Sequence, residues 1–277
     1  MKAKNIKKII LSVVLGILMI FHLFPVFVMI SSSIKSYNDL IKWPPKWIVK
    51  DPQIVNYEEV LFGEKSILNP FLNSLFISLI VMILCIIIGI LAAYSVTRFE
   101  FIGKKTFLMA IILTQMFSPV LLVNPMYLTF RSLNLLDTRI SLIVANLASS
   151  LPMTIWLLYS YFSQIPKDYE ESSWMDGCSR VRGIFDIILP LAMPGIITAG
   201  LFAFIASWGD IVFARTFITS FNLRTISQAL TSFEDLYKTR WELQMAASVI
   251  TSLPPFLIFL SIQKKLIQGM TTDGVKG

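Results

Sequence analysis

Residues 66–97, SILNPFLNSLFISLIVMILCIIIGILAAYSVT, contain no Lys, Arg, Asp or Glu. A predominantly apolar stretch of more than ~18 residues can cross the hydrocarbon core of a bilayer as a helix. Five further stretches of the chain are also free of these charged residues and exceed that length. They are residues 9–34, 106–130, 140–166, 187–209 and 243–263. The sequence therefore predicts six membrane spans.

The composition of the whole chain agrees with this prediction. Of the 277 residues, 55% are hydrophobic and 15% are charged, whereas soluble domains carry roughly 25% charged residues. A bilayer core offers no partner to a free backbone amide, and these segments are too long and too uniformly apolar for alternating barrel strands. The expected fold class is all-α, a polytopic membrane protein with six transmembrane helices.

The distribution of basic residues predicts the orientation. Just over half of the 24 Lys and Arg residues lie near the N-terminus, in residues 98–105 and 167–182, and in the C-terminal tail, and such a bias marks the cytoplasmic side. We expect both termini in the cytoplasm of a bacterial or archaeal cell and the chain in its inner membrane. Basic margins beside anionic lipid account for the net charge of +7 without nucleic acid.

Prolines interrupt several predicted spans. They are Pro119, Pro125, Pro152, Pro190, Pro194, Pro254 and Pro255. Each removes a helical hydrogen bond and is expected to bend its helix. Broken helices are tolerated in a membrane where they line a cavity, which fits a transport path, but proline is also common in ordinary membrane helices. The polar connection 215–242 is either a solvated linker or a docking element.

Motifs for nucleotide or metal chemistry are missing from the sequence. It contains no phosphate-binding glycine loop and no H-E-x-x-H pair. The single histidine, His22, lies in an apolar stretch and is read as a packed neutral side chain rather than a proton relay. Cys85 and Cys178 are placed too far apart to form a disulfide framework. We therefore expect no catalytic site in this chain.

A polar segment directly before the fifth stretch carries a distinct pattern. Residues 170–195 read EESSWMDGCSRVRGIFDIILPLAMPG. Pro166 and the acidic residues behind it favour a helix start. Gly177 is suited to a left-handed turn, and Ser179 can cap a second helix. Two short helices joined by a glycine turn are expected.

The first of these two helices is expected to contact a partner. Tyr169 shares a face with the small pair Ser172 and Ser173, and Trp174 and Met175 add apolar bulk. A solvated loop has little reason to expose these aromatic and apolar groups together. The alternative is that the loop tucks under its own helix bundle.

The spacing E-S-S-x-x-D-G-C, followed by Ile187-x-Leu189-Pro190, resembles the EAA motif of permeases in binding-protein-dependent ABC importers. By position, Glu171 matches the Glu of that motif, Ser172 and Ser173 match its two Ala, and Asp176, Gly177, Cys178 and Pro190 match its later residues. Further stretches resemble the maltose-type, MalG-like sugar permeases of this family. These are NPFLNSLFISL, AAYSVTRFEFIGKK, SLNLLDTRISLI, LPMTIWLLYSYFSQIPKDYEE and GMTTDGVKG.

This resemblance implies the ABC importer permease fold and one half of a heterodimeric carbohydrate channel, with oligosaccharide as the expected cargo. The expected partners are a second, MalF-like permease subunit, two cytoplasmic ATPase subunits, an extracytoplasmic solute-binding protein and membrane lipid. The chain would bind no cofactor, and ATP and Mg would belong to the ATPase. The residues implied in ATPase coupling are Glu170, Glu171, Ser172, Ser173, Trp174, Met175, Asp176, Gly177, Cys178 and Pro190.

The resemblance also suggests a division of the chain. Residues 1–69 would form the first transmembrane helix and an extracytoplasmic loop, and residues 70–277 a five-helix permease core with its coupling loop at 163–186. Polar residues at depth in the spans are candidates for the substrate pathway: Asn73, Gln115, Asn146, Thr154, Trp208 and Asp210. Asp210 could equally lie at the headgroup level. The alternative function is an ion-coupled secondary transporter, which would need membrane-buried ionisable groups such as His22 and Asp210.

Overall fold

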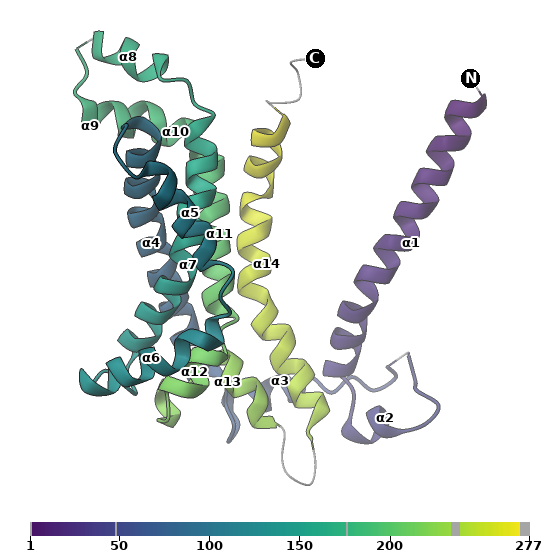
Figure 1. The fold of residues 1–277 in the computed structure, drawn as a ribbon. Coiled ribbons are helices and arrows are strands. Elements are labelled where there is room, and N and C mark those ends of the chain that lie inside the picture. The colour runs from purple at the N-terminus through teal and green to yellow at the C-terminus, as the bar shows by residue number, and fades with distance from the viewer. Residues whose placement is uncertain (1, 48, 176, 234–238, 272–277) are drawn as a thin grey trace. The chain divides into compact units, whose positions relative to one another are not determined.

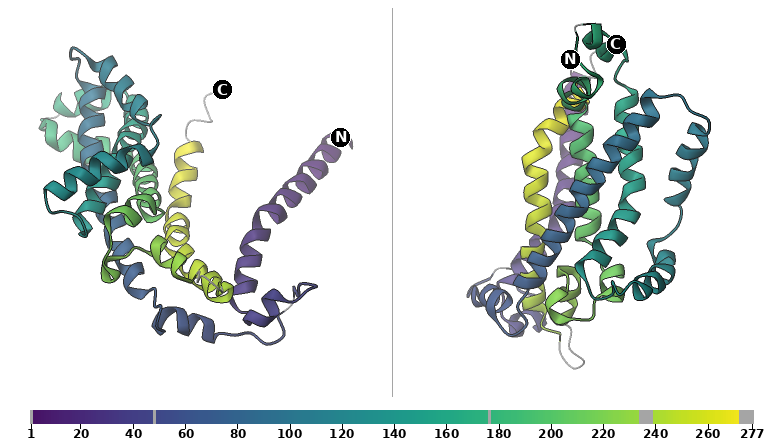
Figure 2. Two further views of the ribbon diagram at one scale, coloured as in Figure 1. Left: turned by 60° about the horizontal axis from the view of Figure 1, so that its bottom comes forward. Right: turned by 90° about the vertical axis from the view of Figure 1, so that its left-hand side faces the viewer.

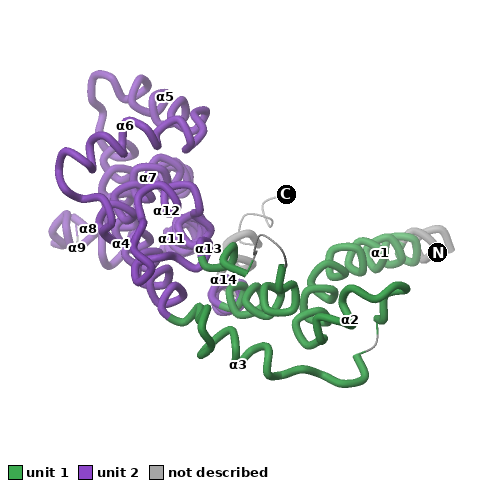
Figure 3. The backbone as a smooth tube through the Cα atoms, turned by 90° about the horizontal axis from the view of Figure 1, so that it is seen from below, with its two compact units in different colours: residues 1–68, 229–253 green, residues 69–228, 254–277 purple. Residues whose placement is uncertain are grey.

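The protein is described by a computed structural model that covers residues 2–47, 49–175, 177–233 and 239–271. The chain divides into two compact units (Figure 3). Unit 1 comprises residues 1–68 and 229–253, and unit 2 comprises residues 69–228 and 254–277. Both units are built from helices, as the sequence predicts (Figure 1).

Unit 1 contains the long N-terminal helix and a loop that folds back on its end. Its elements are α1 (Lys2–Ser33), α2 (Tyr37–Ile41), α3 (Val55–Phe62), the 3₁₀ turn η3 (Thr231–Phe233) and the start of α14 (Trp241–Thr271). The Asn56 side-chain amide donates to the carbonyl oxygens of Ser33 at 2.9 Å and Lys35 at 3.0 Å. These two bonds fix α3 against the end of α1.

Unit 2 contains the remaining helices. They are α4 (Leu68–Arg98), α5 (Lys104–Thr114), α6 (Pro119–Ser132), α7 (Arg139–Ser163), α8 (Asp168–Met175), α9 (Arg180–Gly183), the π-helical turn η1 (Ile184–Ile188), α10 (Leu189–Leu191), α11 (Met193–Trp208), α12 (Val212–Phe217), the 3₁₀ turn η2 (Phe221–Leu223) and, at the unit boundary, α13 (Ile226–Leu230). Helices α4, α7 and α11 form a bundle, with α8 and α9 at one end and α6 and α12 at the other (Figure 1).

Small residues allow the helices of this bundle to approach closely. A Cβ added to Gly195 of α11 would lie 2.7 Å from Cβ of Tyr161 in α7. A Cβ added to Gly89 of α4 would lie 2.9 Å from a methyl group of Leu158 in α7. Lipid tails are as apolar as leucine, so close packing rather than escape from water holds such helices together.

The apolar helices agree with the predicted spans, with two modifications. Four helices are long and apolar enough to cross a membrane: residues 8–33, Leu68–Arg98, Arg139–Ser163 and residues 241–263. Two bent pairs complete six spans if each pair counts as one. They are Lys104–Thr114 with Pro119–Ser132, bent by 97°, and Arg180–Leu191 with Met193–Trp208, bent by 77°. The bends expected at the prolines of 106–130 and 187–209 are therefore confirmed.

Prolines account for both bends. Pro119 stands at the start of α6, where the Ser118 side chain accepts a hydrogen bond from the Val120 amide and caps the new helix. Figure 2 shows α6 turned across the end of the bundle, away from the direction of α5. Pro190 and Pro194 flank the second bend at Ala192. Pro125, Pro152, Pro254 and Pro255 lie inside continuous helices, so they interrupt no span.

Candidate functional site: the α8–α9 hairpin and its anchor

The segment that connects α7 to η1 forms the predicted pair of short helices. Helix α8 begins at Asp168 and carries Asp168, Glu170 and Glu171 in its first turn, where carboxylates complement the positive end of the helix dipole. Helix α9 is capped by Ser179, whose Oγ accepts a hydrogen bond from the Arg182 amide at 3.3 Å. The predicted start near Pro166 and the predicted cap are both confirmed.

The turn between the two helices is a Schellman motif. The amide of Gly177 donates to the carbonyl oxygen of Trp174 at 3.1 Å, and the amide of Cys178 donates to that of Ser173 at 3.0 Å. Gly177 has φ +86°, a backbone conformation that favours glycine. The predicted left-handed turn at Gly177 is therefore confirmed. Asp176, which the sequence also places in the motif, lies outside the described residues.

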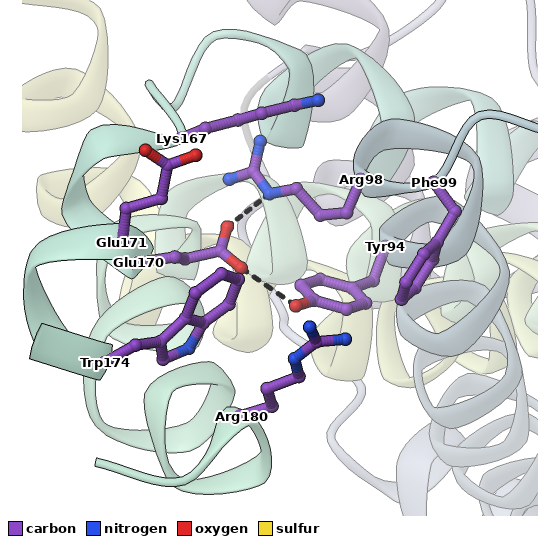
Figure 4. Close-up of a pocket in the computed structure, with 8 residues that line it drawn as sticks. All are labelled: Tyr94, Arg98, Phe99, Lys167, Glu170, Glu171, Trp174 and Arg180. Carbon is purple, nitrogen blue, oxygen red and sulfur yellow. Dashed lines mark hydrogen bonds and ion pairs between the residues drawn. The ribbon is translucent and has the colours of Figure 1, made fainter. Parts of the chain in front are cut away.

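A buried ion pair anchors α8 to the end of α4. Glu170 is only 3% exposed, and its carboxylate pairs with the Arg98 guanidinium (Figure 4). The hydroxyl of Tyr94 donates to the second carboxylate oxygen of Glu170 at 2.8 Å. Arg98 also donates to the carbonyl oxygen of Ile165 at 3.1 Å. These contacts fix both α8 and the chain that enters it.

The anchor borders a cavity of about 230 Å³. Its lining residues come from the end of α4 and from the hairpin: Tyr94, Arg98, Phe99, Lys167, Glu170, Glu171, Trp174 and Arg180. Figure 4 shows Glu170 between Arg98 and Tyr94, with Trp174 and Arg180 on the α8–α9 side. The Arg180 guanidinium lies 5.2 Å from the centre of the Trp174 ring, a cation–π contact between the two short helices.

The outward face of α8 combines apolar and charged groups. Tyr169, Trp174 and Met175 are exposed, Met175 to 89%. Glu171 and Ser172 are exposed as well. We name these five residues the α8 face. Because Met175 projects almost completely from the chain, the α8 face offers an apolar contact to another protein.

The inward face of α8 differs from the sequence-based expectation. Ser172 and Ser173 were both expected to be open to a partner, but Ser173 is 5% exposed. Its hydroxyl donates to the carbonyl oxygen of Glu170 at 2.7 Å. A Cβ added to Gly183 of α9 would lie 3.3 Å from that hydroxyl oxygen. The small side chain at Ser173 therefore serves the contact between α8 and α9. Of the other motif residues, Cys178 is half-buried and Pro190 is exposed on α10.

Most of the predicted pathway residues lie inside the packing of unit 2. Asn73, Asn146, Thr154 and Trp208 are buried. The Asn73 amide donates to the carbonyl oxygens of Asn222 at 2.8 Å and Arg224 at 3.1 Å. Thr154 donates to the carbonyl oxygen of Ser150 within its own helix, and Trp208 packs against Phe71 and Phe204. In this structure these four side chains line no open path, since each is enclosed by the chain itself.

The two remaining candidates differ from one another. Gln115 is exposed at the break between α5 and α6. Asp210 accepts hydrogen bonds from the amides of Phe213 at 3.1 Å and Ala214 at 3.2 Å, and from the side-chain amide of Asn146 at 3.3 Å. Asp210 therefore joins the start of α12 to α7, a structural role that the sequence did not indicate.

Two further polar arrangements escaped the sequence analysis. Arg98 and Tyr94 were not singled out, although Arg98 is the first charge after the stretch 66–97. Asp137, in the turn before α7, accepts hydrogen bonds from the amides of Thr219 and Ser220, each at 2.9 Å, and from the Ser220 hydroxyl. Its partners follow α12, so only the folded chain brings this group together.

A bundle of apolar helices long enough to cross a membrane, with a short polar hairpin at one end, is compatible with a membrane permease. The chain belongs to the family described as "Binding-protein-dependent transport system inner membrane component", which it matches over residues 85–272.

Individual relatives support this assignment over almost the whole chain. The inner membrane ABC transporter permease protein YcjP of Escherichia coli K12 is 32% identical over 95% of this chain and 94% of the relative. The trehalose/maltose transport system permease protein MalG of Thermococcus litoralis is 32% identical and covered completely in both chains. A chain in the crystal structure of a bacterial ABC transporter that imports alginate has a TM-score of 0.78 at 22% identity, over 96% of this chain and 98% of that one.

The family membership decides between the two functions left open by the sequence. The protein is a multi-pass inner membrane permease subunit of a binding-protein-dependent ABC importer. Permeases of this family are non-catalytic, and ATP hydrolysis belongs to a separate subunit. The alternative of an ion-coupled secondary transporter was therefore wrong.

Proposed function

We propose that this permease imports carbohydrate, most specifically an oligosaccharide, and that it forms one half of a heterodimeric channel with a second permease subunit. The trehalose/maltose and alginate importers among its relatives support a sugar cargo. Residues 70–277 act as the permease core, and residues 1–69 supply the first span and an outer loop.

The α8–α9 hairpin, within residues 163–186, is the coupling element of this proposal. The observation that carries it is the α8 face: Met175 is 89% exposed on a helix whose opposite side is held by the buried pair of Glu170 and Arg98. A partner that moves the α8 face therefore also moves α4. The partner proposed is a cytoplasmic ATPase subunit, which places both termini in the cytoplasm.

Mechanically, ATP binding would close the ATPase dimer and draw the docked hairpins together. Helices transmit such motion as nearly rigid units. The ion pair at the end of α4 would pass the displacement into the bundle of α4, α7 and α11, which would alternate between inward-open and outward-open forms. On the opposite side, the connection 215–242 would face the solute-binding protein.

A substitution on the α8 face tests the coupling proposal. Met175→Glu introduces a charge into the apolar contact, and we expect it to abolish co-purification of the ATPase subunit and ATP-driven sugar uptake in proteoliposomes. Leu133→Glu is the matched control, because Leu133 is also exposed (60%) but caps the end of α6, which lies at the opposite end of the bundle from α8 (Figure 1). Unchanged co-purification of the ATPase with Met175→Glu would reject the coupling role.

The nature of the cargo is tested separately. The cognate solute-binding protein should bind a neutral or acidic oligosaccharide in isothermal titration calorimetry, and the same sugar should be taken up by proteoliposomes that contain the complete importer. Selective binding of an amino acid, a peptide or a metal ion would reject the carbohydrate assignment while leaving the coupling proposal intact.

A further inference from the structure

The loop that follows α1 borders a basic cavity in unit 1. The loop starts at Lys35, and the Gln53 amide donates to the carbonyl oxygen of Ile34 at 2.8 Å. The cavity is partly open and has a volume of about 310 Å³. It is lined by Lys35, Asp39, Lys42, Lys46, Val49, Lys50 and Asp51. Neither the coupling hairpin nor the family assignment explains this arrangement.

The lining of this cavity is positively charged. It carries four lysines and two aspartates. Asp39 lies 3.6 Å from the Lys42 ammonium and 3.7 Å from that of Lys46, but these side chains are exposed, so the pairs are weak. The Ser36 hydroxyl, together with these two lysines, lowers the pKa of Asp39, so that it is a carboxylate at neutral pH. An excess of two positive charges is left.

Lys35 is the buried member of this group. The residue as a whole is 9% exposed, and it lines the cavity. Four ammonium groups around one cavity repel one another, and an anion in the cavity would relieve this repulsion. The excess positive charge therefore favours an anionic ligand.

The surroundings of the cavity place this anion at the surface of the bilayer. The apolar side chains of α1 are exposed along its length, as expected for a helix in contact with lipid. The lysines alternate with Trp43, which is 89% exposed, and with Trp47, whose ring lies 5.7 Å from that of Phe24 on α1. Tryptophan is enriched at the level of the lipid headgroups. A basic cavity beside such a belt is suited to a lipid phosphate.

We propose that four lysines of this loop bind the phosphate of an anionic phospholipid headgroup, with Lys35 as the least exposed ligand and Lys42, Lys46 and Lys50 around it. The lipid chains would lie along the exposed side of α1. A bound headgroup would fix the α1–α3 loop in place, because the loop residues contribute the lysines and Asn56 ties α3 to the end of α1.

Native mass spectrometry of the delipidated full-length protein, titrated with defined lipids, tests this site. We expect phosphatidylglycerol to bind and phosphatidylcholine to bind far more weakly. The double variant Lys42→Gln/Lys46→Gln should lower the affinity for phosphatidylglycerol roughly fivefold for each lysine removed, because one surface lysine attracts anionic lipid with about 1 kcal/mol. Both side chains are exposed, so this variant should fold normally. Lys65→Gln/Arg131→Gln removes the same charge elsewhere and should bind as wild type.

Variants of the buried residue sharpen the test. Lys35→Gln should weaken phosphatidylglycerol binding more than Lys42→Gln alone or Lys46→Gln alone. Lys35→Arg, which keeps the charge, should retain binding. Equal affinity for phosphatidylglycerol in the wild type and in Lys42→Gln/Lys46→Gln would overturn the proposal. So would inorganic phosphate that binds as tightly as the lipid, because the occupant would then be a soluble anion. Crosslinking of these lysines to the solute-binding protein in place of lipid binding would also overturn it.

Discussion

Glu170 in α8 and Arg98 at the end of α4 form a buried ion pair, which joins a short exposed helix to a membrane-spanning one. Glu170 lies on the buried side of α8, whereas Met175 on the same short helix is 89% exposed. A displacement of Met175 would therefore reach α4 through the ion pair and its hydrogen bonds.

Removing one member of this pair should release α8. Glu170→Ala leaves the Arg98 guanidinium buried without its partner, a loss of about 3–5 kcal/mol for pairs of this kind. We expect faster hydrogen–deuterium exchange over residues 168–175 and a lower unfolding temperature. Glu171→Gln is the control, because Glu171 is exposed and outside the pair. In the double variant Arg98→Met/Glu170→Met most of the stability should return; a double variant as unstable as Glu170→Ala would argue against the pair.

The turn at Gly177 should tolerate asparagine but not valine. A left-handed backbone costs an ordinary residue about 1–2 kcal/mol, and no atom lies within 4 Å of a Cβ added at Gly177, so the strain is in the backbone alone. Gly177→Val should impair sugar uptake and ATPase association while the protein still inserts in the membrane. Gly177→Asn should be close to wild type, since asparagine adopts positive φ more readily. Normal uptake by Gly177→Val would reject the turn as a coupling element.

Gly195 should be required for the packing of α11 on α7. Gly195→Ala forces the added methyl group against the Tyr161 side chain, and overpacking of this kind typically costs about 1–3 kcal/mol. Thermal unfolding in detergent should show the loss. Tyr161→Gly in the same chain should relieve the clash, because it removes Cβ of Tyr161 as well as the ring. The control is Gly16→Ala in α1, where an added Cβ meets no atom within 4 Å; equal effects at the two glycines would contradict this packing.

The hydrogen bonds of Asp137 to residues 219 and 220 should be lost at acid pH, which lowers the local stability of this turn. The hydroxyl and amide of Ser220, with the amide of Thr219, hold the pKa of Asp137 below its usual value. A lowered folded-state pKa stabilises the fold above the unfolded-state value, about pH 3.9, and this contribution is lost as the pH falls through the folded-state pKa. The amides of Thr219 and Ser220 should be protected from exchange at neutral pH and open in acid. In Asp137→Asn they should be less protected at neutral pH and insensitive to acid; an unchanged pH profile would reject the role of the carboxylate.

Local sequence signals predicted the helices well where one strong pattern dominated. The stretch 66–97 became α4 and 140–166 became α7, because an unbroken apolar run leaves a helix as the favoured structure in lipid. Gly177 and Ser179 were predicted correctly because a left-handed C-terminal turn and an N-cap each depend on one residue type. The bend expected at Pro119 was also predicted correctly, because a capping residue before proline is itself a helix-start signal.

Contacts between distant parts of the chain were beyond such signals. Asn73 and Asn146 are polar residues within predicted spans, as expected of a polar pathway. Their side-chain amides instead donate hydrogen bonds to the carbonyl oxygens of Asn222 and Leu142, respectively. The sequence alone does not distinguish a polar side chain that faces a channel from one that forms a hydrogen bond to the backbone of its own chain. Glu170 was grouped with the docking residues for a similar reason, since its partner Arg98 becomes visible only when α4 and α8 are folded together.

In the proposed coupling, the α8 face contacts the ATPase subunit. Cysteine crosslinking tests it most directly, in a background in which Cys85 and Cys178 are replaced by serine. We expect that Glu171→Cys forms a crosslink to the ATPase subunit and that Ser173→Cys, two positions along the same helix but 5% exposed, does not. If Glu171→Cys forms crosslinks only to lipid or to a second copy of itself, the α8 face does not contact the ATPase.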